Sequence, residues 1–208
     1  AMTKDEAIAS LEAGITVTND LINKGAKLIG TGEMGIGNTT PSSAILAAIT
    51  DLSLDKIVGF GTGINKQKLK NKKKIITRAL KVNQPKKDDG IEILAKVGGF
   101  EIGGMAGIML NSAANRTPVM IDGLISGAAA LIAQKIEPKV TDYLIPSHKS
   151  MEPGHIKMYE YLGLEPMLDL EMRLGEGTGA VLGMHLVEAA TRILKGMATF
   201  EEAQITEN

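Results

Sequence analysis

Short apolar runs alternate with helical patterns along this chain. Five runs have the length of buried strands: residues 26–29, 56–60, 118–121, 143–146 and 166–170. Apolar residues recur at helical spacing between these runs: residues 3–25, 42–49, 66–80, 91–97, 100–110, 124–136, 155–161 and 180–194. This alternation predicts an α/β fold, with a mainly parallel sheet flanked by helices in a Rossmann-like three-layer arrangement. The length of 208 residues suits one domain, which we expect at residues 2–208.

The predicted helices differ in what they are expected to pack against. The first begins at Thr3, which can form a capping box with Glu6. Residues 100–110 are apolar on nearly every side, which is typical of a helix buried in a core or against another subunit. Residues 180–194 are expected to close the core, and residues 199–202 to start a last short capped helix.

Composition narrows the class of protein. Aromatic residues make up only 3% of the chain, so Leu, Ile, Val, Ala and Met must fill the core. There is no cysteine, which excludes disulfides and cysteine nucleophiles and fits a reducing cytoplasm. A net charge of −1 favours neither nucleic acid nor an anionic membrane as the main partner, and no apolar run has membrane-spanning length. We therefore expect a cytoplasmic protein, with Ala1 before Met2 as the remnant of a tag.

Residues 30–41 form a glycine-rich turn between a predicted strand and a predicted helix. Three glycines allow the backbone to adopt positive φ and to approach a ligand closely: Gly32, Gly35 and Gly37. Thr39 or Thr40 is expected to cap the helix, with Pro41 at its first position. Because exposed amides at a helix start favour an anion, this turn is a candidate phosphate cradle.

Glu33 is the unusual residue of this turn. A carboxylate beside an anion is repulsive, so we expect Glu33 to contact a neutral or cationic group, such as a ribose hydroxyl or a ring N–H. The glycines alone fit equally well with an ordinary turn in which Glu33 lies in solvent.

Two further glycine-rich turns follow. The turn at residues 61–63 precedes a helix with six lysines, which is usually a solvated face but can also aim one lysine at a phosphate. In the turn at residues 174–179, Glu176 lies between Gly175 and Gly177. We expect a confined, poorly hydrated place for it, because desolvation raises the pKa of a carboxyl group and makes it a better base near neutrality. A glutamate that only caps the next helix fits the spacing too.

In parallel sheets the ligand crevice lies beyond the carboxyl ends of the strands, so we expect the polar turns to meet there. These turns supply carboxylates and anion binders: Glu33, Asp122, Ser147, Ser150, Glu152 and Glu176. The histidines lack the spacing of a zinc site, so we expect no metal. A Ser/His hydrolase at Ser147, His148 and Ser150 is a weaker alternative, because no Gly-x-Ser-x-Gly elbow occurs.

Taken in order, the motifs of this chain resemble one enzyme family. They are GEMGIGNTT at residues 32–40, the glycine turn at 61–63 with its basic helix, GGFEI at 98–102, SHKSMEPGH at 147–155 and RLGEGTGA at 173–180. This series is similar to the nicotinate-nucleotide–dimethylbenzimidazole phosphoribosyltransferase family, which makes the lower-ligand nucleotide of cobalamin. The resemblance spans nearly the whole chain.

The resemblance implies that a benzimidazole nitrogen attacks the anomeric carbon of nicotinate mononucleotide and expels nicotinate with inversion, giving α-ribazole 5′-phosphate. Glu176 matches the general base that takes the azole N–H proton, and Glu33 matches a second carboxylate of the site. The residues expected to bind the substrates are Gly35, Ile36, Gly37, Asn38, Lys72, Ser150, Leu174 and Asp122. No metal or other cofactor is implied, because the pyridinium leaving group departs as a neutral ring.

The same resemblance implies a homodimer, with residues 100–110 as a surface to bury. Enzymes of this family are longer, and this chain lacks a counterpart of the N-terminal portion that helps to wall the base pocket. A nucleotide-binding module that keeps the cradle without turnover is therefore the main alternative. In both cases the expected partners are the mononucleotide and a benzimidazole-type base, with no nucleic acid and no membrane.

Overall fold

A small parallel sheet lies at the centre of the molecule. The computed structural model describes residues 1–61 and 63–204, so that Thr62 of the second predicted glycine-rich turn lies outside the described residues. The strands β1 (Ile29–Gly30), β2 (Val119–Ile121) and β3 (Leu144–Pro146) pair in the order β1-β2-β3. All pairs are parallel, and Met120 of β2 lies beside Gly30 and Ile145. The predicted α/β fold with a parallel sheet is confirmed, although the strands are shorter than expected.

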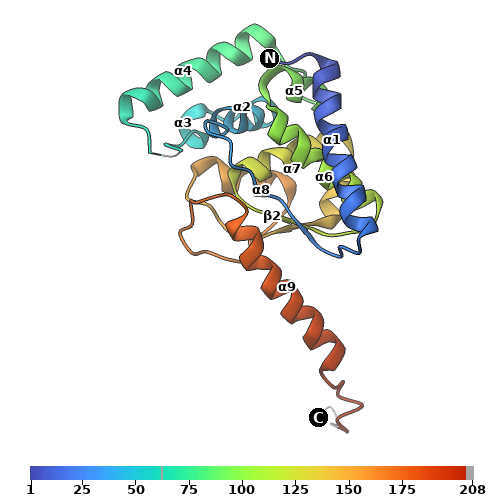
Figure 1. Cartoon of the computed structure of the whole chain (residues 1–208). Coiled ribbons are helices and arrows are strands. Elements are labelled where there is room, and N and C mark those ends of the chain that lie inside the picture. Colours follow the sequence, from blue (N-terminus) through green and yellow to red (C-terminus); the bar gives the residue numbers. More distant parts are fainter. Residues whose placement is uncertain (62, 205–208) are drawn as a thin grey trace.

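The described part of the chain has nine α-helices and one 3₁₀ helix. They are α1 (Lys4–Asn23), α2 (Thr39–Thr50), α3 (Leu54–Ile57), α4 (Lys66–Asn83), α5 (Gly90–Val97), α6 (Phe100–Ala114), α7 (Leu124–Ile136), η1 (Pro138–Tyr143), α8 (Pro153–Leu162) and α9 (Thr178–Gly196). Helices α1 to α8 lie mostly to one side of β2, and α9 runs away on the other (Figure 1). Thr3 and Glu6 form the predicted capping box at the start of α1.

Two of the predicted strands do not form. Residues 54–57 make the short helix α3, and the chain continues as an extended segment from Val58. Ile57 at the end of the helix and Val58 are both buried in the core. Residues 166–170 contribute only one parallel bridge, between Leu168 and His148. The first run is apolar because Ile57 and Val58 are buried, and burial alone does not distinguish a strand from another extended segment. The second run lies at the surface, with Met167 and Leu170 exposed, so its apolar residues do not mark a core strand.

The start of α2 also differs from the prediction. Asn38, not Thr39 or Thr40, occupies the N-cap position, and its side chain makes no capping hydrogen bond. Pro41 is the third residue of the helix rather than the first. The amide of Asn38 is engaged instead by the carboxylate of Glu33, 2.7 Å away, which leaves the first amides of α2 without a side-chain cap.

Helix α6 is a core helix of this chain, as one of the two expectations for residues 100–110 has it. It packs along α1 on one side and contacts α7 on another, and its residues Ile102, Ala106 and Met109 are fully buried. Small residues allow the backbones of α1 and α6 to approach closely. A Cβ atom on Gly107, for example, would lie 2.0 Å from the carbonyl oxygen of Leu11.

The prediction that residues 180–194 close the core is wrong. Only the first turns of α9 contact the sheet, where Gly183 packs against the sulfur of Met120. Beyond them α9 extends away from the rest of the molecule (Figure 1), and Leu186, Ile193 and Leu194 are exposed. After α9, residues 200–204 form turns. The predicted cap is present, because Glu202 N–H donates to Oγ1 of Thr199 at 3.1 Å and Thr199 N–H donates to Oε2 of Glu202 at 2.8 Å, while the continuation of the predicted helix lies outside the described residues. No described helix is both long and apolar enough to cross a membrane.

The contact between α1 and α6 predicts opposite effects for two glycines of one helix. Gly107→Ala should lower the free energy of unfolding by about 2 kcal/mol or more, because backbone atoms must move to admit the methyl group. Gly104→Ala should be neutral or stabilising by up to about 1 kcal/mol, because its Cβ would meet only the carbonyl oxygen of Ser10, at 3.9 Å, and alanine favours a helix. Urea denaturation of both variants measures the difference; equal effects would contradict the described packing.

Candidate active site

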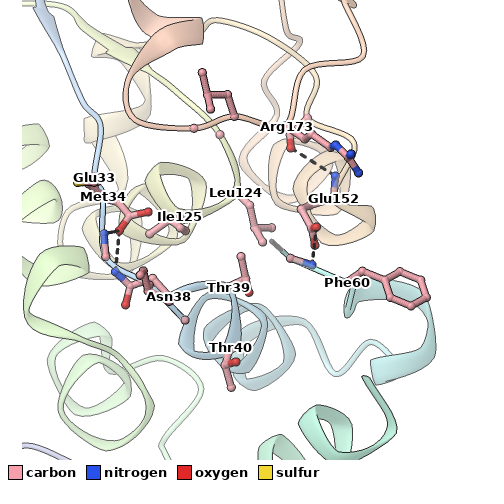
Figure 2. A pocket seen from close by; sticks show the side chains of 18 of the residues that line it. Glu33, Met34, Asn38, Thr39, Thr40, Phe60, Leu124, Ile125, Glu152 and Arg173 are labelled. Carbon is pink, nitrogen blue, oxygen red and sulfur yellow. Dashed lines mark hydrogen bonds between the residues drawn. The ribbon is translucent and has the colours of Figure 1, made fainter. Parts of the chain in front are cut away.

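A cavity of about 730 Å³ opens where the three strands end. The chain leaving β1 forms the loop at residues 31–38, β2 runs into Asp122, and β3 runs into Ser147, so the carboxyl ends of the strands meet at one place as predicted. Ten residues predicted from the sequence all line this cavity: Glu33, Gly35, Ile36, Gly37, Asn38, Lys72, Asp122, Ser150, Leu174 and Glu176. Figure 2 shows part of this lining.

Glu33 folds back onto its own loop. Its Oε2 atom accepts hydrogen bonds from the backbone N–H of Gly35 and from the side-chain amide of Asn38, both at 2.7 Å (Figure 2). These bonds fix the glycine-rich turn, in which Gly37 has a positive φ of 97°. The apolar side chain of Ile36 projects from the same loop and is 96% exposed. Glu33 is therefore part of the cavity wall rather than a free surface charge.

The loop of Glu176 lies against the loop of Glu33. A Cβ atom on Gly32 would stand 2.6 Å from the Cα atom of Gly177, so this contact needs glycine at position 32. Glu176 itself has a left-handed backbone, with φ of 60°, between two glycines with φ of 80°. Glu33 and Glu176, which are far apart in sequence, thus face one cavity.

The expected confinement of Glu176 is wrong. Its side chain is exposed in this structure, and the neighbouring Leu174 is 67% exposed. Both residues stand on a loop that turns outward through left-handed conformations, and none of the described residues covers it. The desolvation that we expected from the flanking glycines and the apolar helix is therefore not provided by this chain.

Asp122 holds the Glu176 loop in place. Its carboxylate is 3% exposed and accepts three backbone hydrogen bonds, from Gly177 (3.0 Å), Gly179 (2.8 Å) and Ala180 (3.2 Å). This arrangement caps the start of α9 from the end of β2 and is favoured by the helix dipole. The sequence places Asp122 among substrate-binding residues; its oxygens in this structure bind the loop that carries Glu176 instead.

Lys72 is the buried lysine of the basic helix α4. It is 7% exposed, and its Nζ atom donates to Oγ1 of Thr39 at 2.8 Å and to the carbonyl oxygen of Gly59 at 3.3 Å. Burial lowers the pKa of Lys72, and the nearby Glu152 carboxylate opposes that shift. The solvated-face interpretation is thus wrong for Lys72, which brings its ammonium group to the first turn of α2.

Glu152 is the counterpart of this lysine. Its Oε1 atom accepts the N–H of Gly61 at 2.9 Å, whereas its buried Oε2 atom has no hydrogen-bond partner among the described residues. Gly59 must be glycine here, because a Cβ atom would lie 2.2 Å from Oε2. Ser150, which was predicted to bind substrate, lies two residues before Glu152. Its Oγ atom accepts the N–H of Glu152 at 3.3 Å. One wall of the cavity therefore carries a lysine and a carboxylate together.

Two buried histidines lie at the cavity: His148 lines it, and His155 lies behind His148, with the ring centroids 5.9 Å apart. The backbone N–H of Ser150 donates to Nδ1 of His155 at 2.9 Å, so the proton of this neutral ring is on Nε2, which is buried without a partner among the described residues. Burial lowers the pKa of His155 to about 3, and the neighbouring His148 adds to this effect. Ser147 is fully buried and its hydroxyl donates to the carbonyl oxygen of Ile121 at 2.6 Å, which argues against a serine nucleophile there.

Three lining residues had no expected role: Phe60, Leu124 and Arg173. Thr39, expected only as a helix cap, His148, expected only in the hydrolase alternative, and Glu152, expected among the polar turns, also line the cavity. A signal for Lys72 did exist in the helical spacing, because Lys72 lies four residues before the buried Ile76 and therefore shares its face of α4.

These features define an α/β protein with a strand-end cavity suited to a phosphorylated ligand: a buried lysine and an uncapped helix start on one side, and two carboxylates on the other. Comparison with known proteins identifies the family. A family model described as "Phosphoribosyltransferase" matches residues 1–205. The chain belongs to the nicotinate-nucleotide–dimethylbenzimidazole phosphoribosyltransferase family, as its motifs indicated.

Individual relatives support this assignment. The protein of that name from Desulforamulus reducens is 54% identical over 206 residues, which are 99% of this chain and 59% of the relative. The Geobacter sulfurreducens protein is 53% identical over 207 residues, 100% of this chain and 59% of the relative. The crystal structure of CobT from Thermus thermophilus matches with a TM-score of 0.95 and 44% identity, over 100% of this chain and 62% of that one. This chain thus spans about three fifths of the length of these relatives.

The buried histidine predicts a loss of stability in acid. The unfolded chain binds a proton at His155 near pH 6.5, whereas the folded chain does so only near pH 3, so the free energy of unfolding should fall as the pH drops below about 6.5. Between pH 7.5 and 5.0 this group alone should cost about 2 kcal/mol. His155→Asn, whose amide oxygen can still accept the N–H of Ser150, should lose about that much less over the same interval.

Urea denaturation at both pH values measures this difference. The value at pH 7.5 accounts for packing lost in the variant, and the remaining acid sensitivity includes His148, whose pKa is also lowered by burial. If the two proteins lose equal stability between pH 7.5 and 5.0, His155 is not the acid-sensitive group.

Proposed function

We propose that this chain provides the nucleotide-binding and base-activating residues of a nicotinate-nucleotide–dimethylbenzimidazole phosphoribosyltransferase. The reaction moves the phosphoribosyl group from nicotinate mononucleotide to 5,6-dimethylbenzimidazole and yields α-ribazole 5′-phosphate and nicotinate. The observation that carries this proposal is the shared cavity: Glu33 and Glu176 line it together with the buried Lys72. The names of the relatives point to the same substrates.

In this proposal the phosphate end of the mononucleotide lies at the start of α2. The ammonium group of Lys72, 2.8 Å from Oγ1 of Thr39, supplies positive charge there, and the first amides of α2 supply donors. Ser150 lines the same wall. Residues 35–38 lie against the nucleotide, where glycine permits close approach of the backbone.

At the other end, one nitrogen of the benzimidazole attacks the anomeric carbon as the bond from that carbon to the pyridinium nitrogen breaks. The electron pair of that bond neutralises the departing nicotinate ring. The N–H proton of the benzimidazole passes to Glu176 as general base, a role that its place on the cavity rim allows. Glu33, fixed by two hydrogen bonds, is a second carboxylate that can stabilise positive charge developing on the ribose.

The base side of the cavity is open in this chain. Leu174 and Ile36 are 67% and 96% exposed at its mouth, and we propose that they contact the flat aromatic base. We also propose that the chain acts as one domain, residues 2–208, within a homodimer; the exposed apolar residues of α9 support a further protein contact.

The second candidate is a nucleotide-binding module without turnover, which the exposure of Glu176 favours. Mixing the protein with nicotinate mononucleotide and 5,6-dimethylbenzimidazole separates the two. Release of nicotinate, followed by chromatography, supports the transferase. Binding of the mononucleotide without release supports the module, and absence of binding contradicts both.

Replacing the proposed base should reduce turnover without disturbing the fold. Glu176→Gln keeps the shape of the side chain but cannot take a proton, so nicotinate release should fall by about 100- to 10,000-fold with binding of the mononucleotide retained. Glu171→Gln is a matched control, because Glu171 is also exposed and left-handed, with φ of 52°, but does not line the cavity. An unchanged rate in Glu176→Gln would remove it from this role.

Replacing the buried lysine should act on the phosphate. Lys72→Met keeps the aliphatic stem and removes the charge, so the dissociation constant of nicotinate mononucleotide should rise about 10- to 100-fold. The dephosphorylated nucleoside should bind the variant almost as before. Lys74→Met, at an exposed residue of the same helix, is the control. Isothermal titration measures both dissociation constants. If they rise equally for the nucleotide and the nucleoside, Lys72 does not bind the phosphate.

A further inference from the structure

We propose that Nε2 of His148 accepts a hydrogen bond from a ribose hydroxyl of the bound mononucleotide, and so helps to select a ribonucleotide. The inference rests on the proposed function and deepens it, since it names a ligand contact for a residue that the proposed function does not use. His148 lines the cavity although its side chain is only 2% exposed. A buried polar atom that faces a cavity without a partner calls for an explanation.

The ring of His148 is fixed between two glycines. A Cβ atom on Gly179 would lie 1.9 Å from Nδ1, so no larger residue fits on that side. On the other side Gly123, which precedes α7 and also lines the cavity, has its Cβ position 3.9 Å from Nε2. The imidazole therefore has its Nδ1 edge towards Gly179 and its Nε2 atom beside Gly123. Gly123 and the next residue, Leu124, are called the cavity floor below.

The hydrogen bonds determine which nitrogen carries the proton. The Ser147 hydroxyl oxygen lies 2.6 Å from the carbonyl oxygen of Ile121, a distance that requires the hydroxyl hydrogen between them. Ser147 has no second hydrogen, so the 3.0 Å contact between its Oγ atom and Nδ1 of His148 needs the proton on Nδ1. In the neutral ring Nε2 then carries a lone pair and can only accept.

The ring is neutral near pH 7. Burial lowers the pKa of His148, and the Asp122 carboxylate, whose Oδ1 atom is 3.8 Å from Nδ1, opposes the shift only in part. None of the described residues hydrogen-bonds to Nε2 of His148. That atom is also not sealed in the core, in contrast to Nε2 of His155. The cavity floor therefore offers one unused acceptor.

The chemistry of the ligand restricts what can meet this acceptor. Nicotinate mononucleotide has an ionised carboxylate, a pyridinium nitrogen without hydrogen and an ionised phosphate, so the ribose 2′ and 3′ hydroxyls are its principal hydrogen-bond donors near neutrality. The floor formed by Gly123 and Leu124 lines the same cavity as Lys72 and Glu176, the residues of the phosphate end and the base end in the proposal. A ribose between those ends lies over this floor.

A cycle of ligand and protein changes tests the contact. His148→Asn places an amide near the position of Nδ1, where it can still donate to Ser147, but has no acceptor at the position of Nε2. The original protein should bind the 2′-deoxy or the 3′-deoxy mononucleotide about tenfold more weakly than nicotinate mononucleotide, because the acceptor is left unpaired. In His148→Asn that preference should disappear, with both ligands bound about equally.

A second variant guards against a general structural effect. His148→Gln extends an amide oxygen towards the position of Nε2 and should restore most of the preference for the ribonucleotide, as measured by isothermal titration. If His148→Asn keeps the full tenfold preference, the role of His148 is overturned. If the original protein binds no mononucleotide at all, the proposed function fails, whereas binding without any preference between ribose and both deoxy sugars overturns this inference alone.

Discussion

The carboxylate of Asp122 is the contact on which the site depends. It stands at the end of the central strand β2 and accepts the amides of Gly177, Gly179 and Ala180, so it joins the sheet to the loop that carries Glu176. Hydrogen bonds to an ionised, buried acceptor are among the stronger ones in proteins, and removing one partner leaves amides unpaired. Because the loop of Glu33 packs on the same backbone through Gly32, one carboxylate indirectly sets the distance between Glu33 and Glu176.

Charge balance organises the opposite wall. A lysine that is 7% exposed would be costly alone, and so would the carboxylate of Glu152, which has one buried oxygen without a partner among the described residues. Together they leave this wall nearly neutral, while their hydrogen bonds to Thr39, Gly59 and Gly61 tie α2, α4 and the segment before α8 to each other. In the proposed function, a phosphate would meet an ammonium group that is already positioned and buried, which reduces the reorganisation needed for binding.

The sequence predicted the architecture better than it predicted exposure. Alternating apolar runs located β2, β3 and α7, because those segments are buried in the sheet and its core. Whether α9 is buried depends on what packs against it, and the spacing of its apolar residues does not predict that. Glycine-rich turns and the family motifs identified residues that line one cavity. They could not show that Asp122 binds backbone amides more than 50 residues away, or that Glu176 is exposed, because both are consequences of tertiary packing.

The two ends of the cavity are prepared to different degrees, and this difference bears on the proposed reaction. The proposed phosphate end holds Lys72 and Glu152 with fixed partners, so the proposed ligand would bind there with little rearrangement. At the proposed base end, Ile36, Leu174 and Glu176 are exposed. Water can therefore hydrogen-bond to Glu176, the proposed proton acceptor, and none of the described residues covers the second face of an aromatic base bound there. A poorly oriented nucleophile can lower the rate of transfer by several powers of ten. In the proposed function, affinity for the sugar phosphate and the rate of transfer are therefore separable properties of this site. Covering this end, by whatever protein does so, would act on the rate of transfer far more than on the affinity for the mononucleotide.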